Sequence, residues 1–243
     1  MAKNNKKAKL AASGVMKRKS PTQEIKKRIL VVGEGVNTEP SYFKRFREPG
    51  LQVISIGMGK GTRKLVNDIE SVKSTQEKKL NAQFDEVWAV FDKDSFNDFD
   101  AAIADAHSKG YRVAYSNQAI EYWFILHLKD HQGEALDRAG YVGILNTLLK
   151  DDNAGFAYDS DAKEVSEVMF DFFYKRIQDA FDRASRIFEK KTANGTPTEE
   201  SVTTIHQLVG SILSMTTTES KRSQQKKEDS IRKAQAAIDG VQL

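Results

Sequence analysis

The chain has 243 residues, 39% of them hydrophobic, which is enough for one large domain or two small ones. It contains no cysteine, which excludes disulfides and cysteine-ligated zinc or iron–sulfur centres. The formal net charge is only +4, but residues 1–28 hold ten Lys and Arg against a single acid, Glu24. No apolar run reaches the ~18 residues of a membrane span, and no secretory signal is evident. We therefore expect a cytoplasmic protein with no membrane partner.

Residues 1–27 are predicted to be a disordered basic tail. They are polar and lack a hydrophobic period, so they cannot bury enough apolar surface to order the chain. Their excess of Lys and Arg suits contact with nucleic-acid phosphates. A tail that only keeps the protein soluble has the same composition, so both interpretations stay open.

Residues 28–130 alternate between strand and helix patterns. Strands are expected at 28–33, 51–56, 84–91 and 111–115. Helices are expected at 38–47, 62–79, 96–109 and 118–128. Such alternation is typical of a parallel sheet with right-handed crossover connections. The sequence therefore predicts an α/β core over this segment.

The strand pattern stops at about residue 130. Residues 131–215 are predicted to form a helical part packed on the core, with helices at 135–150, 162–191 and 202–214. Residues 216–243 are polar but rich in helix-forming residues, so we expect a surface helix or a tail.

Acidic side chains stand where the predicted strands end. Glu34 follows the first strand, Asp92 and Asp94 follow the third, and Glu121 lies in the first turn of the helix after the fourth. The carboxyl ends of parallel strands meet at one edge of a sheet, where ligands bind. Carboxylates clustered there repel one another unless a cation is shared, and carboxylate oxygens are the ligands that Mg²⁺ and Mn²⁺ prefer. The pattern predicts a divalent-metal site.

Each acid also has a simpler explanation when it is taken alone. Asp92 or Asp94 could cap the next helix, and Glu39 and Glu121 stand at helix starts, where the macrodipole favours acids. Several acids at successive strand ends of one sheet are harder to explain in this way, so the metal site is favoured.

Three basic residues are weaker predictions for contacts with substrate phosphate. Lys60 and Arg63 accompany a glycine-rich turn at 57–61 that precedes a helix, where backbone N–H groups can hold a phosphate. The turn lacks the Walker A order, so a plain connecting loop is the simpler interpretation. Lys93 stands between the two aspartates and is either a phosphate contact or a solvated side chain.

Histidine offers little evidence of chemistry. His127 and His131 lie four residues apart on an expected helix, which would suit zinc, but no third ligand accompanies them. An ordinary helix face is the simpler interpretation. No side chain in the pattern is an obvious general base.

Four segments carry a family resemblance, and they occur in the expected order and spacing. They are Gly-Glu-Gly-Val-Asn-Thr-Glu-Pro-Ser-Tyr-Phe at 33–43, Val-Phe-Asp-Lys-Asp at 90–94, Ser-Asn-Gln-Ala-Ile-Glu-Tyr-Trp-Phe-Ile-Leu-His at 116–127 and Thr-Thr-Ile-His-Gln-Leu-Val at 203–209. Together they resemble the RloB-like proteins over roughly residues 28–210. One departure is Gln-Ala-Ile at 118–120, where relatives often have Pro-Cys-Phe, which changes the packing before Glu121.

The RloB-like family is similar to the Toprim-fold nucleases, including the OLD-like ones. The resemblance implies a Toprim-like parallel sheet in which Glu34 is the Toprim glutamate and Asp92 and Asp94 are the Asp-x-Asp pair that holds Mg²⁺. Glu39 and Glu121 match acids that complete a two-metal site. The family accompanies prokaryotic restriction-modification and abortive-infection loci, often beside an ATPase. This implies antiphage defence with an ATPase partner.

These observations favour a Mg²⁺- or Mn²⁺-dependent nuclease that acts on DNA or RNA, with Glu34, Asp92 and Asp94 as its catalytic residues. One alternative is a phosphatase of the haloacid-dehalogenase type, in which the first aspartate is a nucleophile. Against it, the aspartate pair comes on the third strand, after another acidic turn. The other alternative is a non-catalytic adaptor that binds nucleic acid or a partner ATPase.

Overall fold

The structure is a computed structural model that describes residues 25, 27–93, 99–132, 136–162, 164–196 and 201–214. Nearly all of the predicted basic tail lies outside the described residues, as does the predicted C-terminal segment 216–243. Asp94, the second member of the predicted aspartate pair, also lies outside them.

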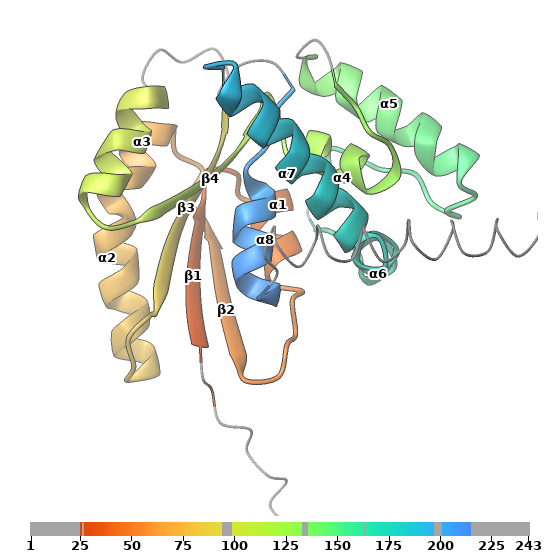
Figure 1. Ribbon diagram of the computed structural model, residues 1–243. Helices are drawn as coiled ribbons and strands as arrows, with labels where there is room; N and C mark the ends of the chain where they lie inside the picture. Colours follow the sequence, from red (N-terminus) through yellow and green to blue (C-terminus); the bar gives the residue numbers. More distant parts are fainter. Residues whose placement is uncertain are drawn as a thin grey trace, which may run out of the picture.

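The centre of the molecule is a parallel sheet of four strands in the order β2-β1-β3-β4 (Figure 1). The strands are β1 (Lys27–Gly33), β2 (Leu51–Gly57), β3 (Glu86–Lys93) and β4 (Arg112–Asn117). The middle strands β1 and β3 are almost continuously apolar because helices cover both faces of the sheet. This architecture confirms the predicted α/β fold of the Toprim-like kind.

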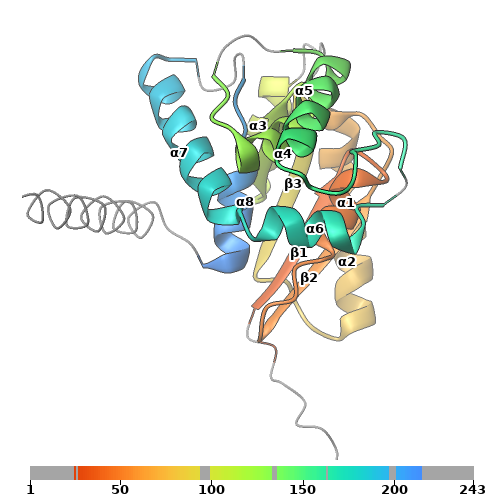
Figure 2. The ribbon, with the colours of Figure 1, turned by 90° about the vertical axis from the view of Figure 1, so that its right-hand side faces the viewer.

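Helices cover the two faces of the sheet unequally. One face carries α2 (Thr62–Leu80) and α3 (Phe99–Ser108), as Figure 1 shows. The other carries α1 (Thr38–Phe43), α4 (Glu121–Leu128) and α8 (Ile205–Leu213). Outside α4 lie α5 (Arg138–Asp151), α6 (Glu167–Tyr174) and α7 (Ile177–Ala193), which Figure 2 shows from the side. None of the described helices is long and apolar enough to cross a membrane.

The predicted long helix at 162–191 is wrong, because the structure has two shorter helices there. Ser166 caps the first of them, α6, by accepting a hydrogen bond from the Met169 N–H at 3.1 Å. The chain then leaves helical geometry at Arg176, where φ is −112° and ψ is 10°. No glycine or proline marks this break, so the helical pattern of the sequence continues straight through it.

An aromatic cluster joins α1 to α4 and fixes the two helices that carry Glu39 and Glu121. The Trp123 indole N–H donates to the Tyr42 hydroxyl at 3.0 Å, and both side chains are buried. The Phe124 ring meets the Tyr42 ring edge-on at 5.4 Å between centroids. Rigid packing of this kind restricts the separation between the two glutamates.

Candidate functional site

Glu34 lies at the carboxyl end of β1, between the ends of the two neighbouring strands. Its N–H donates to the Val90 carbonyl oxygen of β3 at 2.8 Å, and its own carbonyl accepts from the Gly59 N–H at 2.9 Å. The Thr62 hydroxyl, at the start of α2, donates to the Glu34 carboxylate at 3.2 Å. Backbone and side chain are therefore both positioned, and Thr62 is an orienting residue that sequence reasoning missed.

Glycine at positions 35 and 57 lets the Glu34 turn close tightly. A Cβ built on Gly35 would lie 2.1 Å from the Glu39 carboxylate, and one on Gly57 would lie 2.2 Å from the Gly35 carbonyl oxygen. The contact with backbone excludes a side chain at Gly57, whereas a side chain at Gly35 would displace the Glu39 carboxylate. The glycines thereby bring the Glu39 carboxylate against the turn that carries Glu34.

Asp92 stands at the end of β3, half-buried, in a strongly anionic environment. Burial raises its pKa well above the usual range, and the charges of Glu39 and Glu121 raise it further. The charge of Glu34 acts in the same direction. Burial likewise raises the pKa of Glu39, and the Glu121 charge adds to this effect. Three of the predicted acids, Glu34, Glu39 and Glu121, thus lie near enough to act electrostatically on a fourth, Asp92.

Glu121 is the most deeply buried acid of the site, with a fully inaccessible side chain. Its Oε1 accepts hydrogen bonds from Arg138 Nε at 2.8 Å and from the Tyr158 hydroxyl at 2.7 Å. Its Oε2 is buried without a hydrogen-bond partner among the described residues. Leaving such an oxygen unsatisfied is costly, so it is suited to a donor or a cation.

Arg138 and Tyr158 are hydrogen-bond partners of Glu121 that the sequence did not reveal. They lie 17 and 37 residues from Glu121 along the chain, on α5 and in the loop before α6. Neither belongs to a recognisable motif, and only the packing of these segments around α4 brings them to the acidic site.

The donor set fits Mg²⁺ or Mn²⁺ in its chemistry, because it consists of carboxylate oxygens with neither thiol nor imidazole. The unsatisfied Glu121 Oε2 and the raised pKa values of Asp92 and Glu39 both indicate a site that a cation would stabilise. Within the described ranges, no three acidic or histidine side chains converge closely enough to hold an ion by themselves. Asp94, the remaining predicted ligand, lies outside those ranges.

The predicted phosphate-binding residues have other contacts. Lys60 forms an ion pair with Asp68 of α2 and so has a charge partner of its own. The Lys93 ammonium lies 5.5 Å from the centre of the Phe99 ring, a cation–π contact. Arg63 is exposed on the first turn of α2. Phosphate contacts by these three residues therefore stay a prediction.

His127 is a core residue. Its Nδ1 lies 2.9 Å from the Trp123 carbonyl oxygen, and its ring packs 5.0 Å from Phe173. Burial lowers its pKa to about 3, so it stays neutral at ordinary pH. His131 lies beyond the end of α4, so the two histidines do not share one helical face as a zinc pair would.

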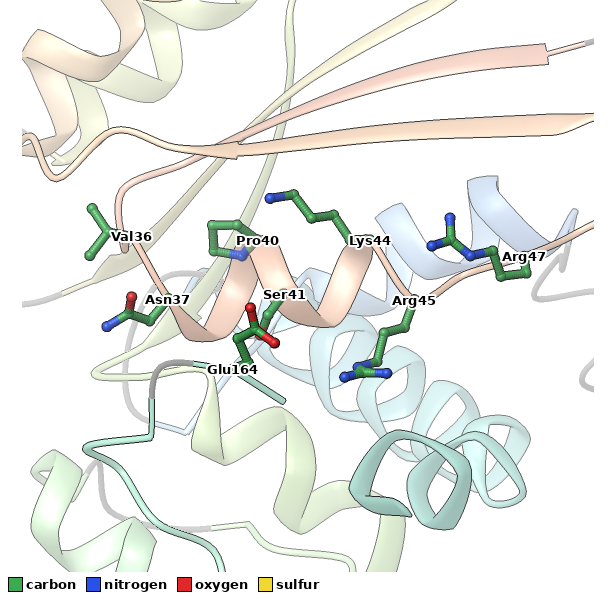
Figure 3. A pocket seen from close by; sticks show the side chains of 8 residues that line it. All are labelled: Val36, Asn37, Pro40, Ser41, Lys44, Arg45, Arg47 and Glu164. Atoms are coloured by element: carbon green, nitrogen blue, oxygen red, sulfur yellow. The ribbon is translucent and has the colours of Figure 1, made fainter. Parts of the chain in front are cut away.

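A surface pocket of about 290 Å³ lies along α1 (Figure 3). Its lining is mostly polar and consists of Val36, Asn37, Pro40, Ser41, Lys44, Arg45, Arg47 and Glu164. Arg45 donates to the Val165 carbonyl oxygen at 2.5 Å. Lys44 and Arg47 are exposed and form no ion pair with any described residue. The pocket therefore carries more positive than negative charge.

A family model described as RloB-like protein matches residues 29–212 of the chain. The comparison with curated proteins found no match, and neither did the comparison with solved structures. The matched segment begins in β1 and ends in α8, so it includes the described sheet except for the first two residues of β1, and it includes the acidic residues Glu34, Glu39, Asp92 and Glu121. The chain therefore belongs to the RloB-like protein family.

Proposed function

We propose that this protein is a metal-dependent nuclease that hydrolyses nucleic-acid phosphodiesters with Mg²⁺ or Mn²⁺. One observation carries the proposal: carboxylates from the ends of β1 and β3 and from the starts of α1 and α4 interact in one site, and one of them keeps a buried oxygen without a partner. Mutual repulsion of this kind is expected where bound divalent ions supply the missing positive charge.

The residues of the site have distinct roles in this proposal. Glu34, oriented by Thr62, and Asp92 would hold metal at the sheet edge, together with Asp94. Arg138 and Tyr158 restrain Oε1 of Glu121, so that Oε2 remains available as a ligand. When bound, two divalent ions supply an activated water and stabilise the leaving oxygen.

The test is a cleavage assay on plasmid, single-stranded DNA and total RNA, with Mg²⁺, Mn²⁺ or EDTA. We expect cleavage that requires the divalent ion. Retained nucleic-acid binding without cleavage in either metal would instead support the adaptor alternative. Recovery of a covalent aspartyl-phosphate would support the phosphatase.

The biological setting that we propose is prokaryotic antiphage defence in the cytoplasm, with an ATPase as partner. Its support is the RloB-like family, which accompanies restriction-modification and abortive-infection loci, often beside an ATPase. Protection of a host against phage, lost on Asp92→Ala, would support this setting. Equal phage sensitivity with and without the active protein and its neighbouring ATPase would contradict it.

The pocket along α1 leads to a prediction about substrate binding. The double variant Lys44→Ala, Arg47→Ala is expected to bind a labelled single-stranded oligonucleotide about tenfold more weakly in Ca²⁺, because two phosphate contacts are lost. The slope of log affinity against log salt should decrease by about 1.4, since each contact contributes about 0.7 for single strands. Fluorescence anisotropy at several salt concentrations measures both quantities.

The matched control is Lys78→Ala, Lys79→Ala, which removes the same charge from exposed positions at the far end of α2. That end lies at the opposite edge of the sheet from Glu34. Equal affinities and salt slopes for the two double variants would show that the pocket does not hold the nucleic acid.

A further inference from the structure

Arg138 connects the buried acids to the solvent. It is the first residue of α5, and its side chain is 49% exposed, whereas Glu121, which it contacts, is 0% exposed. Its Nε donates to Glu121, and its two terminal nitrogens have no hydrogen-bond partner among the described residues. Its positive charge also lowers the pKa values of both Asp92 and Glu39. Arg138 thus acts on three acids, Glu121, Asp92 and Glu39, while its terminal nitrogens remain available as hydrogen-bond donors.

A cation beside these acids matters when an anion enters the site. Glu34, Glu39 and Glu121 all act electrostatically on Asp92, and a phosphodiester carries a further negative charge. The charge of Arg138 offsets part of the repulsion that an entering phosphodiester would meet.

We propose that Arg138 is a catalytic residue that binds the phosphate group undergoing cleavage through its terminal guanidinium nitrogens. This inference rests on the proposed nuclease function. A guanidinium presents parallel N–H donors in a planar fork that matches two phosphate oxygens. Glu121 holds Nε in place, and the hydroxyl of Tyr158 holds Glu121, so the fork is oriented before the substrate binds. Preoriented donors stabilise the charge that develops on the phosphoryl oxygens during cleavage.

The test compares Arg138→Lys with the wild-type protein and with a matched control. R138K keeps the charge beside Glu121 but loses the fork. The control is Arg186→Lys, because Arg186 is also half-exposed, at 50%, and pairs with a carboxylate, Asp130, away from the site. The measurements are Mn²⁺ affinity by calorimetry, oligonucleotide affinity by anisotropy in Ca²⁺, thermal unfolding, and the cleavage rate in Mn²⁺.

We expect R138K to keep its melting temperature and to bind Mn²⁺ within about threefold of wild type. Its oligonucleotide affinity should fall by about tenfold and its cleavage rate by about 100-fold, as for the loss of charge-assisted hydrogen bonds. R186K should match the wild type in all four measurements. Arg138→Gln, which keeps a donor for Glu121 but no charge, should bind the oligonucleotide at least as weakly as R138K.

Two outcomes would overturn the assignment. Unchanged oligonucleotide affinity and cleavage in R138K would show that Arg138 only neutralises Glu121. If R138K loses Mn²⁺ affinity, and this loss explains all of its lost activity, then Arg138 only positions a metal ligand. A wild-type protein that binds no Mn²⁺ would defeat the proposed function itself. Mn²⁺ binding by wild type with an unaffected R138K would defeat the Arg138 assignment alone.

Discussion

Replacing Asp92 with Asn is expected to reduce cleavage in Mn²⁺ by about 10³-fold or more while the protein stays folded. Asparagine has the shape of aspartate but lacks the charge that would bind the metal. Because burial and the neighbouring acids raise the pKa of Asp92, removing its charge also relieves a desolvation cost and repulsion in the metal-free protein. The melting temperature without metal should therefore be unchanged or higher. Initial cleavage rates and thermal melts in EDTA measure the two effects.

The control for this variant is Asp105→Asn, which removes a carboxylate that pairs with Lys109 on the surface of α3. D105N should cleave at the wild-type rate. Asp94→Asn is expected to behave like D92N, since the resemblance assigns both aspartates to the metal. Wild-type cleavage by D92N would show that the acids of the site do not bind a catalytic metal.

Divalent metal is expected to stabilise the protein strongly, and more so as the pH rises. At a thousandfold excess over Kd, a ligand of the native state adds about 4 kcal/mol to the free energy of unfolding. For a chain of this size, that raises the melting temperature by roughly 10 °C. Protons compete with the ion for Asp92 and Glu39, whose pKa values are raised. Thermal melts with Mn²⁺ and with EDTA between pH 5 and 8 measure the effect.

The metal-free protein should show the opposite dependence on pH. A carboxyl with a raised native pKa binds more protons in the native than in the unfolded state. The free energy of unfolding therefore decreases as the pH rises from the usual carboxyl pKa towards the raised one. His127 and His206, with pKa values lowered to about 3 and about 4, destabilise the fold as the pH falls below the usual histidine pKa of 6.5.

D92N separates these two contributions, because it removes one carboxyl and leaves both histidines in place. In EDTA, its melting temperature should fall less steeply with rising pH than that of the wild type. Its stabilisation by Mn²⁺ should be largely lost. The same Mn²⁺ shift in both proteins would place the ion elsewhere.

The sheet and the position of most acids could be predicted from the sequence because both follow from local patterns. Apolar runs marked the buried strands, and parallel connection requires their carboxyl ends to meet at one edge. From that rule alone, Glu34, Asp92 and Glu121 are predicted to lie at the same edge of the sheet. The glycines around Glu34 also indicated a tight turn in the sequence. The structure adds that the Glu39 carboxylate lies close to Gly35 in this turn.

The rest depended on tertiary packing and left no local signal. Arg138 and Tyr158 reach Glu121 only because the segments that carry them pack around α4. The sequence also did not predict that Lys60 pairs with Asp68, eight residues away. Because of this ion pair, Lys60 has a charge partner other than a substrate phosphate. The break between α6 and α7 carries no glycine or proline, so the periodic pattern could not reveal it.

The most direct test of the account is an anomalous diffraction measurement at the manganese edge, on crystals of the wild-type protein soaked in MnCl₂. The account predicts a manganese peak at the carboxyl edge of the sheet, within bonding distance of the Asp92 carboxylate and of either the Glu34 carboxylate or Glu121 Oε2. In D92N crystals the peak should be weakened or absent. Saturating Mn²⁺ with no peak among these acids, or an equal peak in D92N, would contradict the metal site on which the proposed function depends.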